Sequence, residues 1–147
     1  MPFCTRWQPA SYFLLRGGLL ALYLLLAGAQ PGRAQRQYDS WYFGRRTGLQ
    51  FAPGRYWPQQ LTQSAMDTFE NCTSLADSLT GNLLLYSDGE RVWDRTHQEM
   101  PGSYPLGGNR SASEGVLALP APARPGQAYL FTVDSKENYL RGGLRYS

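Results

Sequence analysis

Residues 81–94 read GNLLLYSDGERVWD, and the rest of the predicted fold is arranged around this stretch. The run Leu83–Tyr86 is apolar at every position, which is typical of a strand packed on both faces inside a β-structure. Asp88 and Gly89 both tolerate a positive φ, so they predict a two-residue turn into a second strand at Arg91–Arg95. The stretch therefore predicts a β-hairpin.

Strand-like segments on either side of the hairpin form two triplets of the same order. The first triplet is Cys72–Ala76, Leu83–Ser87 and Arg91–Arg95, and the second is Gly115–Leu119, Tyr129–Val133 and Leu144–Ser147. Roughly 45 residues separate the triplets, which is the blade period of β-propellers. We expect an all-β fold of antiparallel β-meanders, specifically a partial, incomplete β-propeller of about two blades.

The chain divides into three parts on this interpretation. Residues 1–34 are expected to be a signal peptide, and residues 71–147 the first blade and an incomplete second blade. Residues 35–70 carry short strands at Trp41–Gly44 and Gly48–Phe51, followed by a Gln-rich loop that includes at most an edge strand.

The N-terminal pattern predicts export. Arg6 and Arg16 precede an apolar run at Leu19–Ala29, and small residues then offer cleavage after Ala34 or Ala29. A membrane anchor is the alternative, but the run is shorter than the roughly 20 apolar residues that span a bilayer. We therefore expect a secreted or outer cell-surface protein without a stable membrane span after cleavage.

Charge and cysteine content exclude several classes of protein. Three of the 14 basic residues precede residue 35 and all 11 acidic residues follow it, so residues 35–147 carry 11 of each sign. This balance and the absence of a Lys/Arg cluster argue against nucleic acid as a partner. Cys4 lies in the predicted signal peptide, so Cys72 remains alone, and we expect it to be buried as a small apolar side chain.

No catalytic, cofactor-binding or metal-binding residue is expected. His97 is the only histidine and has no neighbouring nucleophile or second ligand, so a hydrogen bond that stabilises a turn is the simpler interpretation. Asp88 is explained by the turn, and Glu90 by a solvated set of charges with the neighbouring arginines. A glycosidase pair of carboxylates stays open, because their separation is a three-dimensional quantity.

Aromatic residues make up 14% of the chain and suggest one candidate binding surface. Trp41, Trp57, Trp93 and Tyr104 could form a platform on which sugar rings stack. Aromatic side chains on strands more often belong to the core or to cross-strand pairs. A glycan-binding set is therefore the less favoured interpretation of these four residues.

An ordered series of motifs carries a resemblance to a known family. The motifs are Trp41-Tyr42-Phe43-Gly44, Gly48, Phe51, Glu70, Cys72, Gly81-Asn82-Leu83-Leu84, Tyr86, Asp88-Gly89, Val92-Trp93-Asp94, His97, Met100-Pro101, Tyr129, Phe131-Thr132-Val133-Asp134, Asn138 and Gly143-Leu144-Arg145-Tyr146-Ser147. Together they resemble the N-terminal, propeller-like region of large secreted Bacteroidetes surface proteins. Asn71 and Glu114-Gly115 depart from the pattern of that family.

The resemblance implies a function as well as a fold. Proteins of that family continue into PKD domains and end in a gliding-motility-associated sorting domain used by the type IX secretion system. By this resemblance the chain is a fragment whose first partner is the missing remainder of the propeller. Its expected role is a non-enzymatic structural or binding module of an adhesin-like or gliding-associated protein, in contact with surface glycans or other surface proteins. The alternative is a fragment of a carbohydrate-active propeller that binds or cleaves glycans.

Overall fold

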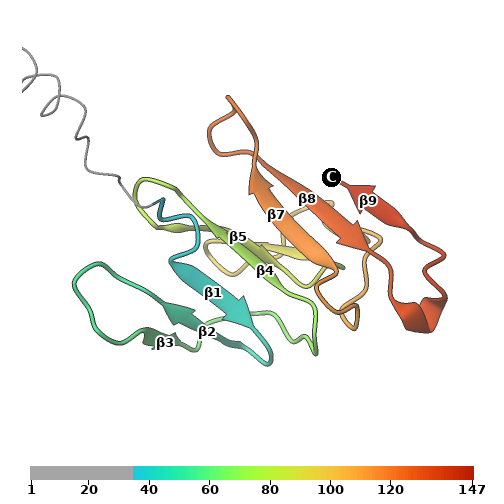
Figure 1. Ribbon diagram of the computed structural model, residues 1–147, viewed down its shortest axis with the longest axis horizontal. Coiled ribbons are helices and arrows are strands. Elements are labelled where there is room, and N and C mark those ends of the chain that lie inside the picture. Colours follow the sequence, from blue (N-terminus) through green and yellow to red (C-terminus); the bar gives the residue numbers. More distant parts are fainter. Residues whose placement is uncertain (1–34) are drawn as a thin grey trace, which may run out of the picture. The chain divides into compact units, whose positions relative to one another are not determined.

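The computed structural model describes residues 35–147, and we refer to this part of the chain as the described unit. This unit is all-β: it contains nine strands and a single turn of 3₁₀-helix at Lys136–Asn138, but no α-helix (Figure 1). The predicted all-β class is thus confirmed. The predicted signal peptide at residues 1–34 and Cys4 lie outside the described residues.

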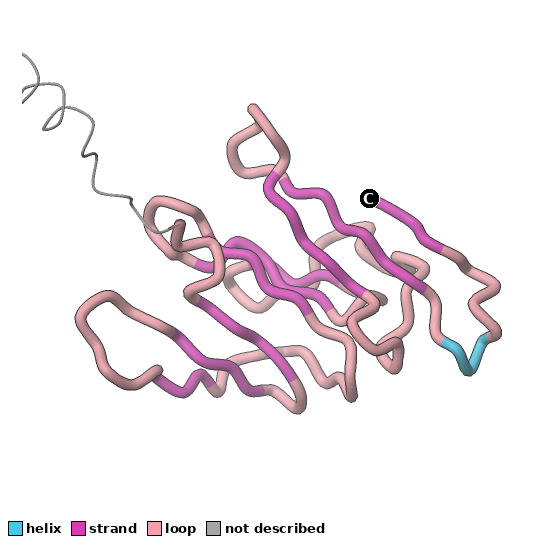
Figure 2. The backbone as a smooth tube through the Cα atoms, in the orientation of Figure 1, coloured by secondary structure: helices cyan, strands magenta, loops and turns pink. Residues whose placement is uncertain are grey.

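The strands form three separate sheets, each an antiparallel meander in chain order (Figure 2). The first sheet contains β1 (Ser40–Phe43), β2 (Thr47–Gln50) and β3 (Gln59–Leu61); the middle sheet β4 (Thr73–Ala76), β5 (Leu83–Ser87) and β6 (Val92–Asp94); and the last sheet β7 (Val116–Pro120), β8 (Ala128–Val133) and β9 (Leu144–Tyr146). The middle and last sheets are the two predicted triplets. The edge strand allowed for in the Gln-rich loop is β3.

The turn of the hairpin at residues 81–94 is longer than the predicted two-residue turn. Ser87 pairs with Val92, so four residues connect the strands rather than the Asp88-Gly89 pair alone. Of these two residues only Gly89 has a positive φ, at 87°. Side chains hold the turn: the Asp88 carboxylate accepts the backbone N–H groups of Glu90 and Arg91 at 2.9 and 2.8 Å. Hydrogen bonds to the Asp88 carboxylate therefore shape this turn, in place of the two-residue turn predicted from Asp88-Gly89.

The first strands of neighbouring sheets run in opposite directions at one end of the unit and in the same direction at the other. The backbone N–H of Ala76, at the end of β4, donates to the carbonyl oxygen of Gln37, just before β1, at 2.8 Å, so β1 and β4 run in opposite directions. Asn71 and Gly115 lie together before β4 and β7, and Ala76 and Pro120 line one groove at their ends, so these two strands run in the same direction. The middle and last sheets thus share an arrangement of their first strands that the first sheet does not share, and no sheet closes.

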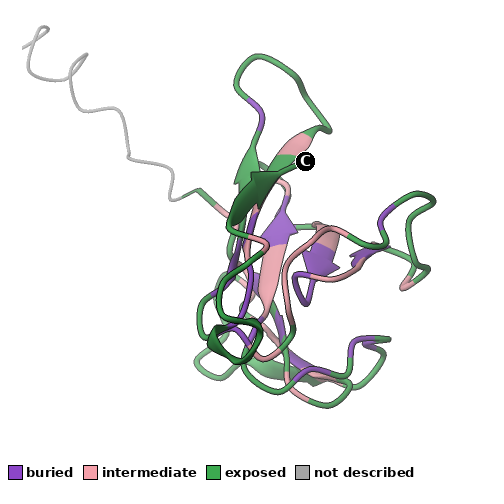
Figure 3. Ribbon diagram, turned by 90° about the vertical axis from the view of Figure 1, so that its right-hand side faces the viewer, coloured by how far each residue is buried: buried purple, intermediate pink, exposed green. Residues whose placement is uncertain are grey.

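The middle sheet is buried on both faces. Its strand β4 lies against both β1 and β7 (Figure 1). Figure 3 shows buried segments in the interior of the unit and exposed ones in its outer strands and loops. Toward the first sheet, Tyr86 and Trp93 pack with Tyr42 and Met66. Toward the last sheet the contact is aliphatic and consists of Leu75, Val92, Val116, Ala118 and Leu130. The two apolar faces of Leu83–Tyr86 therefore reflect two different neighbours.

Truncation of Leu75 to alanine tests this packing. The side chain is fully buried in the aliphatic contact, so Leu75→Ala should lower the free energy of unfolding by about 2–5 kcal/mol. Leu79→Ala is the matched control, because Leu79 is 77% exposed in the neighbouring loop and should change stability by less than about 0.5 kcal/mol. Urea unfolding followed by circular dichroism measures both, and equal losses would contradict the assignment of the core.

Candidate functional site

Three stacked aromatic rings dominate the contact between the first and middle sheets. The rings of Tyr42 and Tyr86 stack with centroids 4.6 Å apart, and Tyr86 stacks on Trp93 at 5.4 Å. All three side chains are buried, Tyr86 completely. Burial raises the pKa of both tyrosines above the ordinary phenol value. The stack is thus a part of the core and offers no open surface to a ligand.

His97 closes one side of this stack. Its Nδ1 lies 3.1 Å from the hydroxyl of Tyr86, which also accepts the backbone N–H of Ala65 at 3.0 Å. The backbone N–H of His97 donates to the carbonyl oxygen of Asp94 at 3.0 Å, and the residue adopts a φ of 63°. Cys72 is half-buried beside the same cluster, and burial raises the pKa of its thiol. These contacts give His97 a structural role in its turn.

The three carboxylates of the hairpin region all serve loops. Asp88 is 3% exposed, and its burial raises the pKa of the carboxyl group although two backbone N–H groups bind it. Asp94 accepts the hydroxyl and N–H of Thr96 and the N–H of Gln98, and these bonds, led by that of the hydroxyl, lower its pKa. Glu90 accepts the backbone N–H of Arg110 at 3.2 Å.

The predicted charge set around Glu90 is arranged differently. Arg91 pairs with Glu99, with 3.5 Å between Nε and Oε2, and its guanidinium lies 4.5 Å from the centre of the Tyr104 ring. The residues from 35 to 147 contain no group of three or more His, Cys, Asp or Glu side chains arranged to hold a metal ion. The charged side chains of the hairpin region therefore hold loops in place.

A further carboxylate orders the connection between β8 and β9. Asp134 accepts the backbone N–H of Gly142 at 2.7 Å, the amide of Asn138 at 2.7 Å and the N–H of Ser135 at 2.8 Å. The bond from Gly142 is the main reason why the pKa of Asp134 lies below its ordinary value. One side chain thus ties together the loop that leads into β9.

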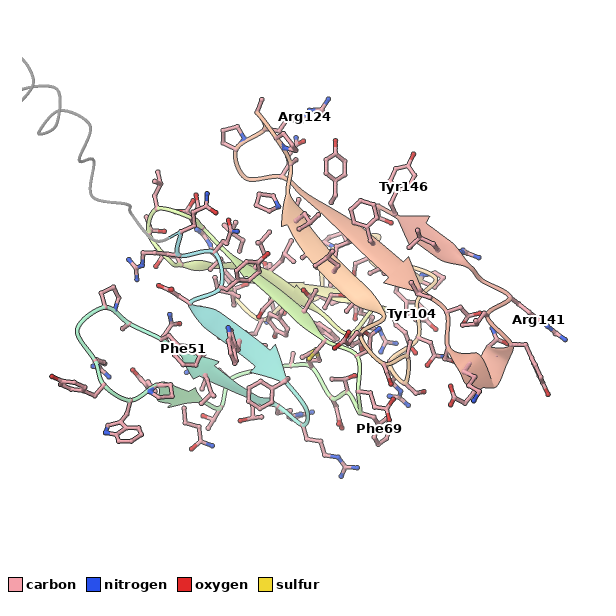
Figure 4. All side chains as sticks on the ribbon, in the orientation of Figure 1. Phe51, Phe69, Tyr104, Arg124, Arg141 and Tyr146 are labelled. Atoms are coloured by element: carbon pink, nitrogen blue, oxygen red, sulfur yellow. The ribbon has the colours of Figure 1, made fainter. Side chains whose placement is uncertain are left out.

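The four aromatic residues proposed as a glycan platform do not come together. Trp93 is only 7% exposed within the stack, so its assignment to a glycan-binding set is wrong: β6 turns this side chain toward the first sheet. Trp41 lies on β1 against Phe51 at 4.8 Å, whereas Tyr104 is in the loop after β6 (Figure 4). Trp57 lies in the loop between β2 and β3 and is 83% exposed.

The sequence interpretation missed the neighbour of Trp57. Tyr56 is 98% exposed, so the two residues form an adjacent aromatic pair in one loop. The signal was present in the sequence, because Pro58 directly follows the pair and has no backbone N–H for a strand ladder, which places both rings in the connection before β3.

Two shallow grooves flank the last sheet. One of about 320 Å³ lies where β4 ends, beside the Pro-rich loop at residues 121–127. The other, of about 400 Å³, is lined by Glu70, residues 111–115 and residues 133–137. In the second groove Glu70 already accepts the hydroxyl of Ser113 at 2.9 Å, and Asp134 is saturated by its own loop. The lining of neither groove includes a histidine or a cysteine.

No family model, curated protein or solved structure matches the chain. Among the residues that the structure describes, none belongs to a helix long and apolar enough to cross a membrane. The fold and the candidate sites therefore rest on the contacts of this chain alone, and the resemblance to Bacteroidetes surface proteins stays a prediction.

The low pKa of Asp134 predicts a dependence of stability on pH. A carboxyl group whose pKa is lowered in the folded state contributes stability above its unfolded pKa of about 3.9, and this stability is lost as the pH falls through the folded pKa. Asp134→Asn should therefore be less stable than the native protein at pH 6, and this difference should shrink below about pH 4. Urea midpoints between pH 6 and pH 3 measure it, and a difference that stays constant would contradict the role of the charge.

Proposed function

We propose that the chain is a non-enzymatic, exported module that acts as a structural or binding unit at the cell surface or outside the cell. The observation that carries the proposal is the use of its carboxylates. Asp88, Asp94 and Asp134 each accept two or more hydrogen bonds from their own loops. Side chains with perturbed pKa values often mark catalytic sites, but here burial explains the raised pKa of Asp88, and hydrogen bonds within loops explain the lowered pKa values of Asp94 and Asp134.

Export is supported by the N-terminal pattern of basic residues, an apolar run and small residues. The resemblance to type IX-secreted surface proteins favours an adhesin-like or gliding-associated role within a propeller-like domain. The middle and last sheets support a propeller-like arrangement, because their first strands run in the same direction and pack side by side.

A second candidate function is glycan binding at the loop between β2 and β3. The exposed pair Tyr56 and Trp57 favours it, since adjacent open rings offer stacking surfaces for sugars. Next to the pair, Arg55 donates to the side chain of Gln59 at 3.3 Å, which places polar groups beside the rings. This loop replaces the four-residue platform as the location of a glycan-binding surface.

A glycan array and a panel of glycoside substrates test both functions on the full chain. We expect no turnover. We expect any glycan bound by the native protein to be bound at least about tenfold more weakly by Trp57→Ala, as is typical of an aromatic residue that anchors a ligand. Tyr104→Ala is the matched control, because Tyr104 is also exposed but lies in a different loop.

Two results would contradict these assignments. Turnover that is abolished by Glu90→Gln or Asp94→Asn would show that the hairpin carboxylates are catalytic and would exclude the non-enzymatic module. Glycan binding that survives Trp57→Ala but is lost in Tyr104→Ala would place the binding surface after β6 rather than in the loop between β2 and β3.

A further inference from the structure

The last sheet presents an apolar face that nothing in the described unit covers. The register places Leu117 opposite Phe131 and Leu119 opposite Tyr129, and Phe131 in turn opposite Tyr146. Directly opposed residues of an antiparallel pair share one face of the sheet, so these five side chains lie together. The exposed fractions are 48% for Leu117, 37% for Leu119 and 76% for Tyr146. We call this surface the last face.

The first sheet presents a second uncovered apolar surface. Trp41 lies opposite Leu49 on the side away from the middle sheet, and Phe43 follows on the same side of β1. Phe51 contacts Trp41 from just beyond β2. Trp41 is 50% exposed, and Phe43 and Phe51 are each 36% exposed. We call this surface the first face.

The two faces lie at opposite ends of the unit. Figure 4 shows Phe51 beside the first sheet and Tyr146 at the far edge of the last sheet, with the middle sheet between them. Exposed apolar patches of this kind on a soluble protein mark surfaces that bind another protein.

The middle sheet indicates what kind of element would cover the last face. Thr73 and Leu75 of β4 point toward the last sheet: Leu75 packs against it, and the Thr73 hydroxyl accepts the N–H of Ala118 at 3.3 Å. Because β4 and β7 run in the same direction, Leu117 and Leu119 of β7 occupy the matching side of the last sheet. In the middle sheet, the side that corresponds to the last face is therefore covered by the face of another β-sheet.

We propose that a second copy of this chain supplies that sheet, by placing its first face on the last face of its partner. Two copies joined in this way at both ends form a closed ring of six sheets, since each contributes three. Six lies within the range of about four to eight sheets that close a propeller-like ring. The two contacts are equivalent by a two-fold axis, and the ring leaves neither apolar face exposed.

Charge and strand direction both permit this arrangement. Residues 35–147 carry equal numbers of acidic and basic residues, so no net charge opposes the association of two copies. Packed sheets interact through side chains and need no common strand direction, and β1 already packs on β4 in the opposite direction. A pairing of last face with last face would bury only one of the two surfaces and would leave Trp41 and Phe43 exposed.

The mass of the native chain in solution is the first test. Sedimentation equilibrium of the full chain, at protein concentrations from roughly 1 to 500 μM, should show the mass of two chains, falling toward one chain on dilution. A single chain at every concentration would overturn the proposal and would favour further sheets of a longer polypeptide as the cover. Larger species that grow without limit would overturn the closed ring in favour of an open, non-closing array.

Charged substitutions on each face test the head-to-tail geometry. Phe43→Lys alters the first face and Leu117→Glu alters the last face, so either variant alone damages both contacts of its ring. Each should dissociate at least about tenfold more readily than the native protein. In an equal mixture, one contact joins two unaltered faces and the other joins lysine to glutamate, so the mass of two chains should return.

Control variants distinguish head-to-tail packing from a loss of folding and from a different pairing of faces. Tyr56→Lys changes an exposed aromatic residue outside both faces and should leave the mass unchanged. If Phe43→Lys or Leu117→Glu loses its circular dichroism spectrum, Trp41→Lys and Tyr146→Glu test the same faces at more exposed positions. A two-chain mass that resists Phe43→Lys, together with a Leu117→Glu variant that the mixture does not rescue, would overturn head-to-tail packing in favour of last face on last face.

Discussion

The structure depends on the burial of both faces of the middle sheet. A three-stranded sheet needs at least one packed apolar face to be stable in water, and this one is covered by aromatic contacts on one side and aliphatic contacts on the other. Strand β5 has an apolar side chain for each face: Tyr86 faces the first sheet and Leu85 faces the last sheet. The outer sheets have only one covered face each, and this imbalance leaves the apolar surfaces at the two ends.

The sequence was sufficient for the class of fold and for the strands of residues 71–147. Apolar alternation and Gly/Pro breaks mark strands locally, so β4 to β9 lie close to their predicted positions. The turn after Ser87 could not be predicted from the Asp88-Gly89 pair, because side-chain acceptors decide its length. The reversed direction of β1 relative to β4 was also beyond local pattern, since it is set by contacts such as that between Gln37 and Ala76.

The candidate sites were less predictable than the fold. Trp41 and Trp93 look alike as strand aromatics, but one faces outward and the other enters the stack with Tyr86. Which face a strand residue occupies depends on register, and register depends on the neighbouring strand. The exposure of Tyr56 and Trp57, by contrast, is expected because both rings lie in a loop, where they have no cross-strand neighbour. Loops are where binding residues concentrate, so this pair is a better candidate than any strand aromatic.

Hydrogen exchange of individual backbone amides on dilute protein tests whether the structure depends on the middle sheet. Strands β2, β5 and β8 are each the central strand of a sheet, but only β5 belongs to a sheet that is covered on both faces. The amides of Leu85 and Tyr86 should therefore exchange more slowly than those of β2 and β8. Amides of β8 that exchange as slowly as those of β5, or more slowly, would contradict the account, because the last sheet would then be as stable as the sheet it is said to depend on.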